Sequence, residues 1–352
     1  MFVNGVGTAN PPQRYSKAEC WEAFMQSDWY GKLGERSRMI ADMVLNKDNG
    51  ITFRALAVPT LAEVFHIDPD TLHARFVAHA PALAVGAADA ALAEAGLTTQ
   101  DIDGVVISTC TGYLCPGLSS YVIERLGLRA DVLAFDLVGQ GCAAALPNWR
   151  LAAALLADDC CLHVLSICVE VSSAAMYLDD DPGVLVSACL FADGAGAAVL
   201  SKSPNPARRA LEWKCFASLT NPRERHALQF DTCRGMLRNV LTRPVPRLAA
   251  EHAHHVLESA LGAAGLTAAD IRVWIIHAGG RDVLHALQSR LQLGSSDLRY
   301  SADMLNMHGN MSSAFVYFVL QAALADRAPP GWWWMSSFGA GFSCHGALLE
   351  AA

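Results

Sequence analysis

The sequence has 352 residues, of which 53% are hydrophobic and 17% charged, and it carries a formal net charge of −8 at pH 7. A mean hydropathy of +0.25 predicts a large core, a sheet buried on both faces, or a subunit interface. The acidic balance, without any run of basic residues, argues against nucleic-acid partners.

The N-terminus and the cysteine content bear on the cellular compartment. Residues 1–16 lack the basic and long apolar regions of a secretory signal, and no segment reaches eighteen uninterrupted apolar residues, so we expect no membrane span. Eleven cysteines without C-x-x-C spacing are expected to be free thiols in a reducing cytoplasm, with no metal site among them. The sequence therefore predicts a soluble cytoplasmic protein without a metal cofactor.

Three segments in the first half of the chain carry clear structural signals. Residues 91–108 predict a helix that stops at Gly96, a turn, and a fully apolar strand. Residues 134–156 predict a strand, a Gly-Gln-Gly turn and an alanine-rich helix with Cys142 in its first turn. Residues 190–201 predict two strands joined around Gly-Ala-Gly. Strands that alternate with helices in this way are typical of α/β proteins.

The second half of the chain repeats these segments in the same order. The pattern of residues 91–108 returns at residues 260–277, the turn and helix around Cys142 return at residues 307–325, and the glycine turn returns at residues 336–350. We interpret the chain as two duplicated α/β halves, residues 1–205 and 206–352, with the seam near residues 202–209. Duplicated turns tend to face each other across a pseudo-twofold axis, so Cys142, Asn310 and His277 are expected to share one cleft.

These three residues have the chemistry of an acyl-transfer site, although a cysteine in such a place is often only a small core residue. A thiol at a helix N-terminus near an imidazole is expected to have a lowered pKa and to act as a nucleophile. Asn310 adds a neutral donor beside His277, and two donors aimed at one carbonyl stabilise a developing enolate or oxyanion. Gly339 and Gly341 allow close backbone approach, so this loop is a candidate oxyanion hole, with an ordinary hairpin turn as the alternative.

Five segments of the chain resemble those of the type III polyketide synthases, the chalcone-synthase-like branch of the thiolase-fold condensing enzymes. They are the nucleophile segment at residues 139–152, the histidine segment at residues 275–291, the asparagine segment at residues 308–320, and two glycine-turn hairpins at residues 190–200 and 338–350. The resemblance implies a five-layered αβαβα thiolase-like fold and a homodimer. It also implies coenzyme A thioesters as substrates, with no metal or redox cofactor.

The resemblance implies a catalytic cycle as well. Cys142 takes an acyl starter from acyl-CoA, and His277 and Asn310 hold the thioester of malonyl-CoA while carbon dioxide leaves. The resulting enolate attacks the acyl group on Cys142 in a Claisen condensation. Repeated extension and cyclisation then give a pyrone, resorcinol or phloroglucinol-type product.

Further site residues are implied by the resemblance, position by position. Phe191 falls on the gatekeeping phenylalanine between the coenzyme A tunnel and the cavity. Arg238 falls on the second gatekeeping position, where a charged side chain changes the cavity mouth unless the register differs by a few residues. Cys110 and Ala175 replace cavity threonines, which favours aliphatic acyl starters. The remaining implied substrate-binding positions are Thr111, Ser172, Ser312, Gly339, Gly341 and the dimer-interface residue Cys115, and the implied coenzyme A contacts are Lys47 and Arg54.

Two other functions fit parts of the same pattern. A β-ketoacyl-[acyl-carrier-protein] synthase III-like enzyme uses the Cys–His–Asn set for a single condensation on a carrier-protein-bound malonyl unit. A catalytically silent partner subunit keeps the fold but loses the nucleophile or one of its helpers. The segments at His277 and Asn310 resemble the polyketide branch, which favours the type III polyketide synthase interpretation.

Overall fold

The computed structural model describes residues 1–46 and 48–352. The first part of the chain contains strands β1 (Phe2–Ala9), β2 (Arg14–Ser16), β3 (Phe53–Ala55), β4 (Gly104–Ser108), β5 (Leu133–Leu137), β6 (His163–Glu170) and β7 (Gly194–Ser201). Its helices are α1 (Lys17–Gln26), α2 (Asp28–Lys32), α3 (Glu35–Asn46), α4 (Pro69–Ala95), α5 (Leu118–Leu126), α6 (Ala145–Leu155) and α7 (Pro182–Leu190).

The second part of the chain contains strands β8 (Leu211–Thr220), β9 (Leu228–Cys233), β10 (Met236–Leu241), β11 (Ile271–Ile276), β12 (Gly331–Gly339) and β13 (Ser343–Ala351). Its helices are α8 (Val245–Ala264), α9 (Arg281–Leu291), α10 (Arg299–His308) and α11 (Phe315–Ala325). Short 3-10 helices precede β4, α6, β11 and α11: η2 (Thr99–Asp101), η3 (Gly141–Ala143), η6 (Ala268–Asp270) and η7 (Ser312–Ala314).

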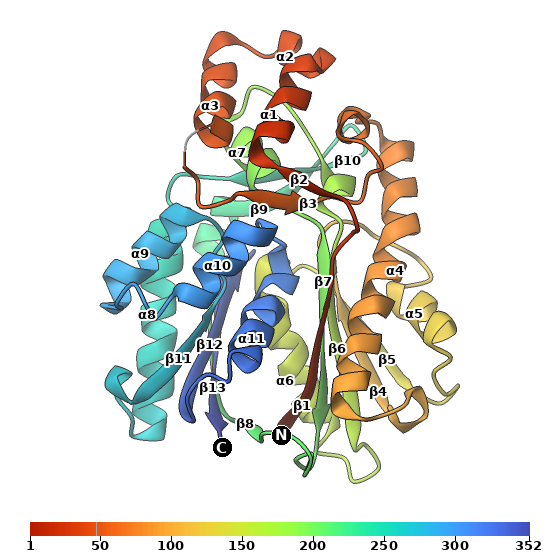
Figure 1. Cartoon of the computed structure of the whole chain (residues 1–352), viewed down its shortest axis with the longest axis vertical. Coiled ribbons are helices and arrows are strands. Elements are labelled where there is room, and N and C mark those ends of the chain that lie inside the picture. The colour runs from red at the N-terminus through yellow and green to blue at the C-terminus, as the bar shows by residue number, and fades with distance from the viewer. Residues whose placement is uncertain (47) are drawn as a thin grey trace.

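One mixed sheet of nine strands runs through the molecule in the order β11-β12-β13-β8-β1-β7-β6-β4-β5 (Figure 1). Strands from the first part of the chain form one side of the sheet and strands from the second part form the other. β1 and β8 pair where the two sides meet. The predicted seam at residues 202–209 lies in the connection from β7 to β8. The division into units of residues 1–205 and 206–352 stays a prediction.

Helices cover and separate the two sides of the sheet, which gives the predicted five-layered αβαβα thiolase-like fold. α4 packs on β1 and β7 at one outer face, and α8 packs on β8 and β13 at the other. α6 and α11 form the middle layer, since α6 contacts β6 and β13 while α11 contacts β1 and β11 (Figure 1). At one end, shown uppermost in Figure 1, α1–α3, α7 and the β9–β10 hairpin form a cap over the sheet.

The repeated segments at residues 91–108 and 260–277 adopt matching local structures. α4 ends at Gly96 and α8 ends at Gly265, and both glycines have a φ of 67° in the left-handed region. Each helix is followed by a capping box, formed by Thr98 with Asp101 in the first copy and by Thr267 with Asp270 in the second. Each box leads into an apolar parallel strand, β4 or β11. The same local sequence therefore places the ends of β4 and β11 in equivalent positions.

The third pair of repeated segments differs in structure. Residues 336–350 form β12, a turn and β13, whereas the prediction of two strands for residues 190–201 is wrong. This segment holds only the end of α7 and the single strand β7.

One helix in the described part of the chain, α4, is long and apolar enough by length and composition to cross a membrane. This differs from the expectation above, because alanines spread through α4 raise its hydropathy although polar residues interrupt it. Half of its most apolar window is buried. Its packing against β1 and β7 accounts for that apolar surface.

The middle layer of the fold is joined by a buried hydrogen-bond network. Trp149 on α6 donates from Nε1 to the Tyr317 hydroxyl on α11 at 3.1 Å. The same hydroxyl lies 2.9 Å from the Ser166 hydroxyl on β6. All three side chains are fully buried, and burial raises the pKa of Tyr317 well above its ordinary value. The network fixes α6 and α11 relative to each other and to the sheet.

Replacing Tyr317 by phenylalanine tests this network. The variant leaves the Trp149 Nε1 donor buried without a partner, which costs about 1–3 kcal/mol. We therefore expect the Tyr317→Phe protein to unfold at lower urea concentration, with an unchanged m-value, when unfolding is followed by circular dichroism. An unchanged midpoint would contradict the importance of the network.

Candidate active site

Cys142 lies in a sharp turn between β5 and α6. Gly139 and Gly141 have φ values of 84° and 55°, which glycine adopts without strain. η3 then leads into α6, so the thiol lies at the start of this helix and is 6% exposed. A Cβ atom at Gly141 would lie 3.1 Å from the nitrogen of Ala340, so this turn is also tightly apposed to the loop at residues 338–342.

The loop at residues 338–342 packs directly on the nucleophile turn. The hydroxyl of Ser337 donates to the carbonyl of Ala143 at 3.1 Å. A Cβ atom at Gly339 would lie only 2.5 Å from the Gln140 carbonyl oxygen and 2.6 Å from the Ala143 nitrogen, so no other residue fits there without displacement. Gly341 has a φ of 127°, which also favours glycine. The oxyanion-hole role of this loop stays a prediction.

His277 follows the last residue of β11 and is almost completely buried. Its backbone N–H donates to the Ser336 carbonyl on β12 at 2.9 Å. Its ring is held between Phe315 and Phe338, whose centroids lie 5.4 and 5.0 Å away. Neither ring nitrogen has a hydrogen-bond partner in the described part of the chain, although the side chain is 1% exposed. A buried imidazole with both nitrogens unpaired is unusual and indicates a place where a ligand supplies the partner.

Asn310 lies between α10 and η7, and its amide is held in one orientation. Its Nδ2 donates to the Gly279 carbonyl at 2.9 Å, and its Oδ1 accepts from the Ser312 backbone N–H at 2.9 Å. Its backbone N–H donates to the Leu190 carbonyl at 3.0 Å, and the chain forms a bridge to Phe191. One amide hydrogen of Asn310 therefore remains available for a further acceptor.

The three predicted residues are connected through one short series of contacts. The Cys142 sulfur lies 3.2 Å from the Ser312 hydroxyl, and the Ser312 backbone N–H donates a hydrogen bond to Asn310 Oδ1. Asn310 Nδ2 in turn donates to the carbonyl of Gly279, two residues beyond His277. The first half of the chain thus contributes the thiol, and the second contributes the imidazole and amide.

Burial determines the protonation of the two titratable groups. It raises the pKa of the Cys142 thiol to about 12 and lowers the pKa of the His277 imidazole to about 3. The expected lowering of the thiol pKa is therefore wrong for this structure. Loss of water outweighs the contact with the Ser312 hydroxyl, which by itself lowers the pKa of the thiol. Both groups are neutral near pH 7.

Glu170, at the end of β6, is a site residue that the sequence interpretation missed. Its fully buried carboxylate accepts hydrogen bonds from the Cys110 backbone N–H at 3.0 Å and the Thr111 hydroxyl at 3.0 Å. The hydroxyls of Ser312 and Ser313 also donate to it. Burial raises its pKa despite these bonds. A lone carboxylate ending an otherwise apolar strand was the sequence signal that could have indicated it.

Two cavities adjoin at the site. The first lies beside Cys142, and its lining includes Cys110 and Ser312. The lining of the second includes Thr111, Ser172 and Ala175. Three residues line both cavities: Phe191, Phe230 and Asn239. The sequence interpretation named Phe191 and missed the other two, because both come from the β9–β10 hairpin, whose register it did not determine.

Three further predicted residues lie outside the two cavities or outside the described residues. Cys115 is exposed and lines neither cavity, and its place at a dimer interface stays a prediction. Arg54 is 6% exposed and donates to the carbonyls of Ala188 and Phe191 at 2.8 and 3.1 Å, which contradicts its expected contact with coenzyme A phosphates. Its guanidinium instead caps the C-terminus of α7 by donating to these two carbonyls. Lys47 lies outside the described residues.

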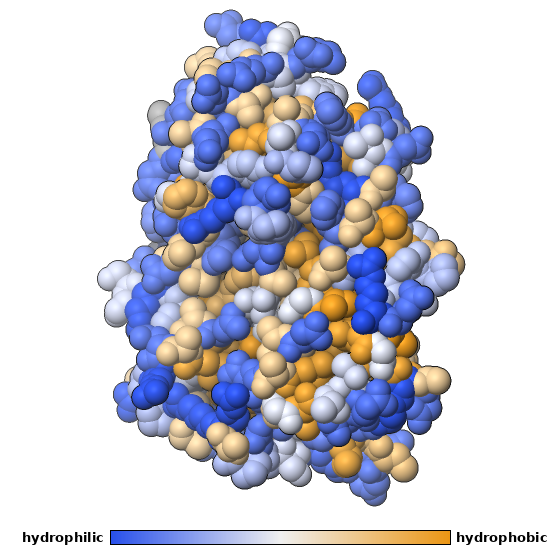
Figure 2. Space-filling view, turned by 45° about the vertical axis from the view of Figure 1, so that its right-hand side comes forward, coloured by the Kyte–Doolittle hydropathy of each residue, from blue (hydrophilic) through white to orange (hydrophobic). Residues whose placement is uncertain are grey.

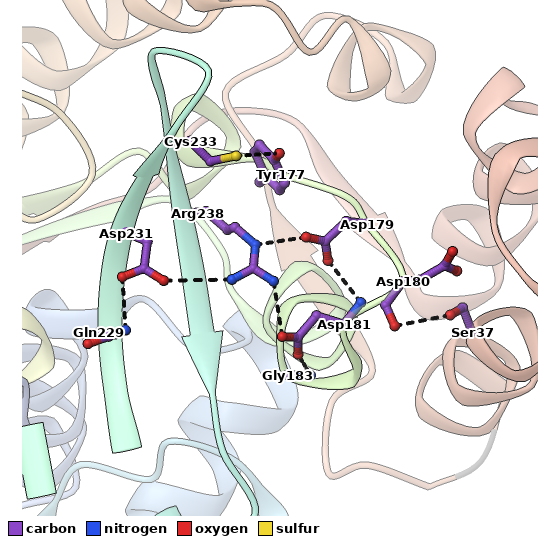
Figure 3. A network of polar contacts seen from close by, with 10 residues as sticks. All are labelled: Ser37, Tyr177, Asp179, Asp180, Asp181, Gly183, Gln229, Asp231, Cys233 and Arg238. Atoms are coloured by element: carbon purple, nitrogen blue, oxygen red, sulfur yellow. Dashed lines mark hydrogen bonds and ion pairs between the residues drawn. The ribbon is translucent and has the colours of Figure 1, made fainter. Parts of the chain in front are cut away.

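Arg238 lines neither cavity, contrary to the expectation that it lines the cavity mouth. It belongs instead to the network of ion pairs drawn in Figure 3. Its guanidinium pairs with Asp179 at 2.7 Å, Asp181 at 3.0 Å and Asp231 at 3.7 Å. Side chains alternate along a strand, so the next residue, Asn239, points to the cavities. A shift of one position moves the expected gatekeeping contact from Arg238 to Asn239.

The described residues, 1–46 and 48–352, contain no group of three or more His, Cys, Asp or Glu side chains arranged to hold a metal ion. The Cys142 thiol contacts the Ser312 hydroxyl, which is linked in turn to the Glu170 carboxyl group, while the Ser312 backbone N–H donates to the Asn310 amide. The His277 imidazole lies beside Phe338, in the loop that packs on the Cys142 turn. A thiolase-like fold with a buried cysteine, histidine and asparagine at its centre defines the class of thiolase-fold acyltransferases.

Comparisons with known proteins narrow this class. The family model described as FAE1/Type III polyketide synthase-like protein matches residues 12–217. The model described as the C-terminal domain of chalcone and stilbene synthases matches residues 222–350. The chain belongs to the type III polyketide synthases and is an acyltransferase of the condensing type. This supports the polyketide interpretation and not the carrier-protein synthase alternative.

Relatives of known activity align with almost the whole chain. A 1,3,6,8-tetrahydroxynaphthalene synthase from Streptomyces peucetius subsp. caesius is 32% identical over 354 residues, which cover 99% of this chain and 92% of the relative. A 3,5-dihydroxyphenylacetyl-CoA synthase from Streptomyces toyocaensis is 29% identical over 362 residues, with coverage of 99% and 89%.

Solved structures agree with the fold. PKS-I from the brown alga Ectocarpus siliculosus superposes with a TM-score of 0.90 at 26% identity, over 99% of this chain and 98% of that one. The 1,3,6,8-tetrahydroxynaphthalene synthase from Streptomyces coelicolor superposes with a TM-score of 0.88 at 21% identity, over 100% and 99% of the two chains. The arrangement of layers described above is thus that of its structural neighbours.

Burial of neutral histidines predicts how stability depends on pH. His345 on β13 is buried beside Ser218, and burial lowers its pKa to about 4, as it lowers that of His277 to about 3. The unfolded chain binds protons on these histidines near pH 6.5, whereas the folded chain does not. Their contribution to stability is therefore full above pH 6.5 and falls as the pH drops toward 4, by up to about 1.4 kcal/mol per pH unit for each histidine.

Urea unfolding at pH 7, 6 and 5 measures this dependence. His345→Gln removes one of the buried histidines, so its unfolding free energy falls less steeply on acidification than that of the unmodified protein. His285→Gln, at an exposed position, serves as the matched control and keeps the original slope. Identical slopes for all three proteins would show that His345 is not buried as a neutral group.

Proposed function

We propose that Cys142 carries the acyl chain and that His277 and Asn310 bind the thioester carbonyl of malonyl-CoA during decarboxylation and condensation. The observation that carries this proposal is the pair of unpartnered ring nitrogens of the buried His277. The His277 ring lies beside Phe338, in the loop that packs on the Cys142 turn. The free amide hydrogen of Asn310 supplies a second donor. Together these groups match an oxygen atom on which negative charge develops.

Loading of the starter begins with proton transfer from the Cys142 thiol to His277. Burial makes a single charge on either residue costly, so thiolate and imidazolium form together as a neutral pair. The thiolate attacks the carbonyl carbon of an acyl-CoA, the bond to the coenzyme A sulfur breaks, and coenzyme A leaves with the proton from His277. The acyl group is then a thioester on Cys142 and His277 is neutral.

Extension uses malonyl-CoA as the source of the carbon nucleophile. Neutral His277 and Asn310 each donate one hydrogen bond to its thioester carbonyl, which stabilises the enolate left when carbon dioxide departs. The enolate carbon attacks the acyl carbon on Cys142, and the thiolate is released as the new carbon–carbon bond forms. The lengthened chain, now a coenzyme A thioester, returns to Cys142 for the next cycle.

The end of the cycle is a cyclisation that gives a pyrone, resorcinol or phloroglucinol-type product. The names of the relatives from S. peucetius and S. toyocaensis both denote hydroxylated aromatic products. Such products arise when several ketone groups of one chain condense with one another. The two adjoining cavities lie beside Cys142, the residue from which the chain grows in this proposal.

Substitutions at the proposed residues separate loading from extension. Cys142→Ala should acquire no acyl adduct by mass spectrometry and should form no product. His277→Ala should slow the release of carbon dioxide from malonyl-CoA by about 100-fold or more, the usual range for a lost general acid–base group. Cys160→Ala, at an exposed thiol, is the matched control and keeps full activity.

Incubation of the unmodified protein with an acyl-CoA and malonyl-CoA alone tests the reaction itself. Release of carbon dioxide without any carrier protein is the expected result. Consumption of malonyl units only after a carrier protein is added would contradict the proposal, and so would an unmodified Cys142 across short, aromatic and long-chain acyl-CoA starters.

The enzyme functions as a cytoplasmic homodimer in this proposal. Its eleven cysteines are free, which suits a reducing compartment. β5 ends the sheet and presents Leu133 and Phe135 on an exposed edge, with Val138, 64% exposed, just beyond it. Figure 2 brings the side of the molecule with α4 and α5 forward and shows apolar residues gathered there. An unpaired apolar edge strand of this kind is suited to pairing with a second copy.

Charged residues on this edge should prevent dimerisation. The double variant Phe135→Glu, Val138→Glu is expected to elute as a monomer in size-exclusion chromatography with light scattering, while the unmodified protein elutes as a dimer. Met307→Glu, at an exposed apolar position on α10, is the control and should remain dimeric. A dimeric double variant would show that β5 is not the interface.

A further inference from the structure

The second cavity contains two buried polar atoms without a partner. The Oδ1 atom of Asn239 and the hydroxyl of Ser172 have no hydrogen-bond partner in the described residues, and both residues line this cavity. Most of the remaining lining is apolar: Leu56, Ala175, Met176, Val184, Ala188 and Phe230. Buried polar atoms in proteins are nearly always paired, so two such atoms in one cavity indicate a ligand that pairs with them.

Asn239 occupies the junction between the two cavities. It lines both of them, together with Phe191 and Phe230, and its side chain is 7% exposed. A chain that grows on Cys142 and extends into the second cavity must pass between these three side chains. Asn239 is the member of this trio that can form hydrogen bonds through its side chain.

The orientation of Asn239 is set by the residue before it. Arg238 is held on the other face of β10 by its ion pairs with Asp179 and Asp181, which precede α7, and with Asp231 on β9 (Figure 3). The segment that bears these aspartates is itself attached to the N-terminal helices, because Asp180 accepts from the Gly34 backbone N–H at 2.8 Å. The strand cannot rotate about its axis without breaking these pairs. Arg238 is thus a positioning residue for Asn239.

We propose that Asn239 is a specificity residue that accepts a hydrogen bond from an enol or phenol hydroxyl of the polyketide chain as the chain enters the second cavity. This inference rests on the proposed function, since such hydroxyls appear only when malonyl units have been added. A β-diketone in its enol form presents one hydroxyl and one carbonyl. The hydroxyl pairs with Asn239 Oδ1, and the carbonyl accepts from the hydroxyl of Ser172.

The chemistry of the cavity selects oxygenated chains over saturated ones. A saturated alkyl chain in the second cavity would displace water from Asn239 and Ser172 without replacing its hydrogen bonds. Sites built to pair a hydroxyl discriminate strongly against analogues that lack it. The second cavity therefore receives the ketone-bearing part of the chain, in contrast to the expectation that small residues at Cys110 and Ala175 favour aliphatic acyl starters.

The test compares Asn239→Leu, which removes the polar atoms at similar volume, with Asn239→Asp, which keeps an oxygen acceptor. Each protein receives hexanoyl-CoA and radiolabelled malonyl-CoA, and products are separated by the number of malonyl units incorporated. In Asn239→Leu the ratio of products with three or more units to the two-unit pyrone is expected to fall about tenfold. Acyl loading on Cys142 should stay within twofold of the unmodified protein. Asn239→Asp should restore at least half of the lost ratio.

Val240→Ala is the matched control, because Val240 neighbours Asn239 on the same strand and faces the other way. Its product ratio should equal that of the unmodified protein. Thermal melting of each variant distinguishes a recognition defect from a folding defect. If the product ratio falls in proportion to the melting temperature across all variants, the inference is overturned.

Two further outcomes are informative. An unchanged product ratio in Asn239→Leu, with an active unmodified protein, overturns the role of Asn239 and leaves the proposed function intact. Absence of malonyl-CoA consumption by the unmodified protein overturns the proposed function, and the inference falls with it.

Discussion

The active site depends on the close packing of two turns that come from different halves of the chain. η3 and η7 lie in the middle layer at the starts of α6 and α11, and their contact places the Cys142 sulfur 3.2 Å from the Ser312 hydroxyl. Glycines at 141 and 339 also leave no side chain between the backbone of the Cys142 turn and that of the loop at residues 338–342. A network of Trp149, Tyr317 and Ser166 behind the turns holds both helices to the sheet.

This packing removes water from the reacting groups, and the electrostatics follow from that. Burial raises the pKa of Cys142 and of Glu170 and lowers the pKa of His277. Charges in such a site are stable only in pairs or when several hydrogen bonds compensate them. The unpaired nitrogens of His277 and the free amide hydrogen of Asn310 are thus available to a negative charge that forms on a substrate oxygen only during the reaction.

Local sequence signals were sufficient for the parts of the site that depend on turns and helix starts. The helix stops at Gly96 and Gly265, the capping boxes, and the placement of Cys142 before α6 are all set by neighbours along the chain. The residue at the junction between the two cavities was harder to predict from the sequence. Arg238 and Asn239 are adjacent in sequence but face opposite sides of β10, so an error of one position exchanges an ion pair for a cavity contact.

The sequence by itself indicated two duplicated α/β halves and nominated Cys142, His277 and Asn310, because the duplicated pattern and its turn residues are local features. Its resemblance to the type III polyketide synthases then implied the thiolase-like fold. Only the tertiary structure decided the protonation of Cys142, the role of Arg54 within the cap and the presence of Asn239 at the junction of the cavities. The physical reason is that the desolvation of a side chain, and the side of a strand on which it lies, depend on every element packed around that residue. Those elements are distant in sequence: α7, β9 and β10 all contribute residues to the cavities beside Cys142.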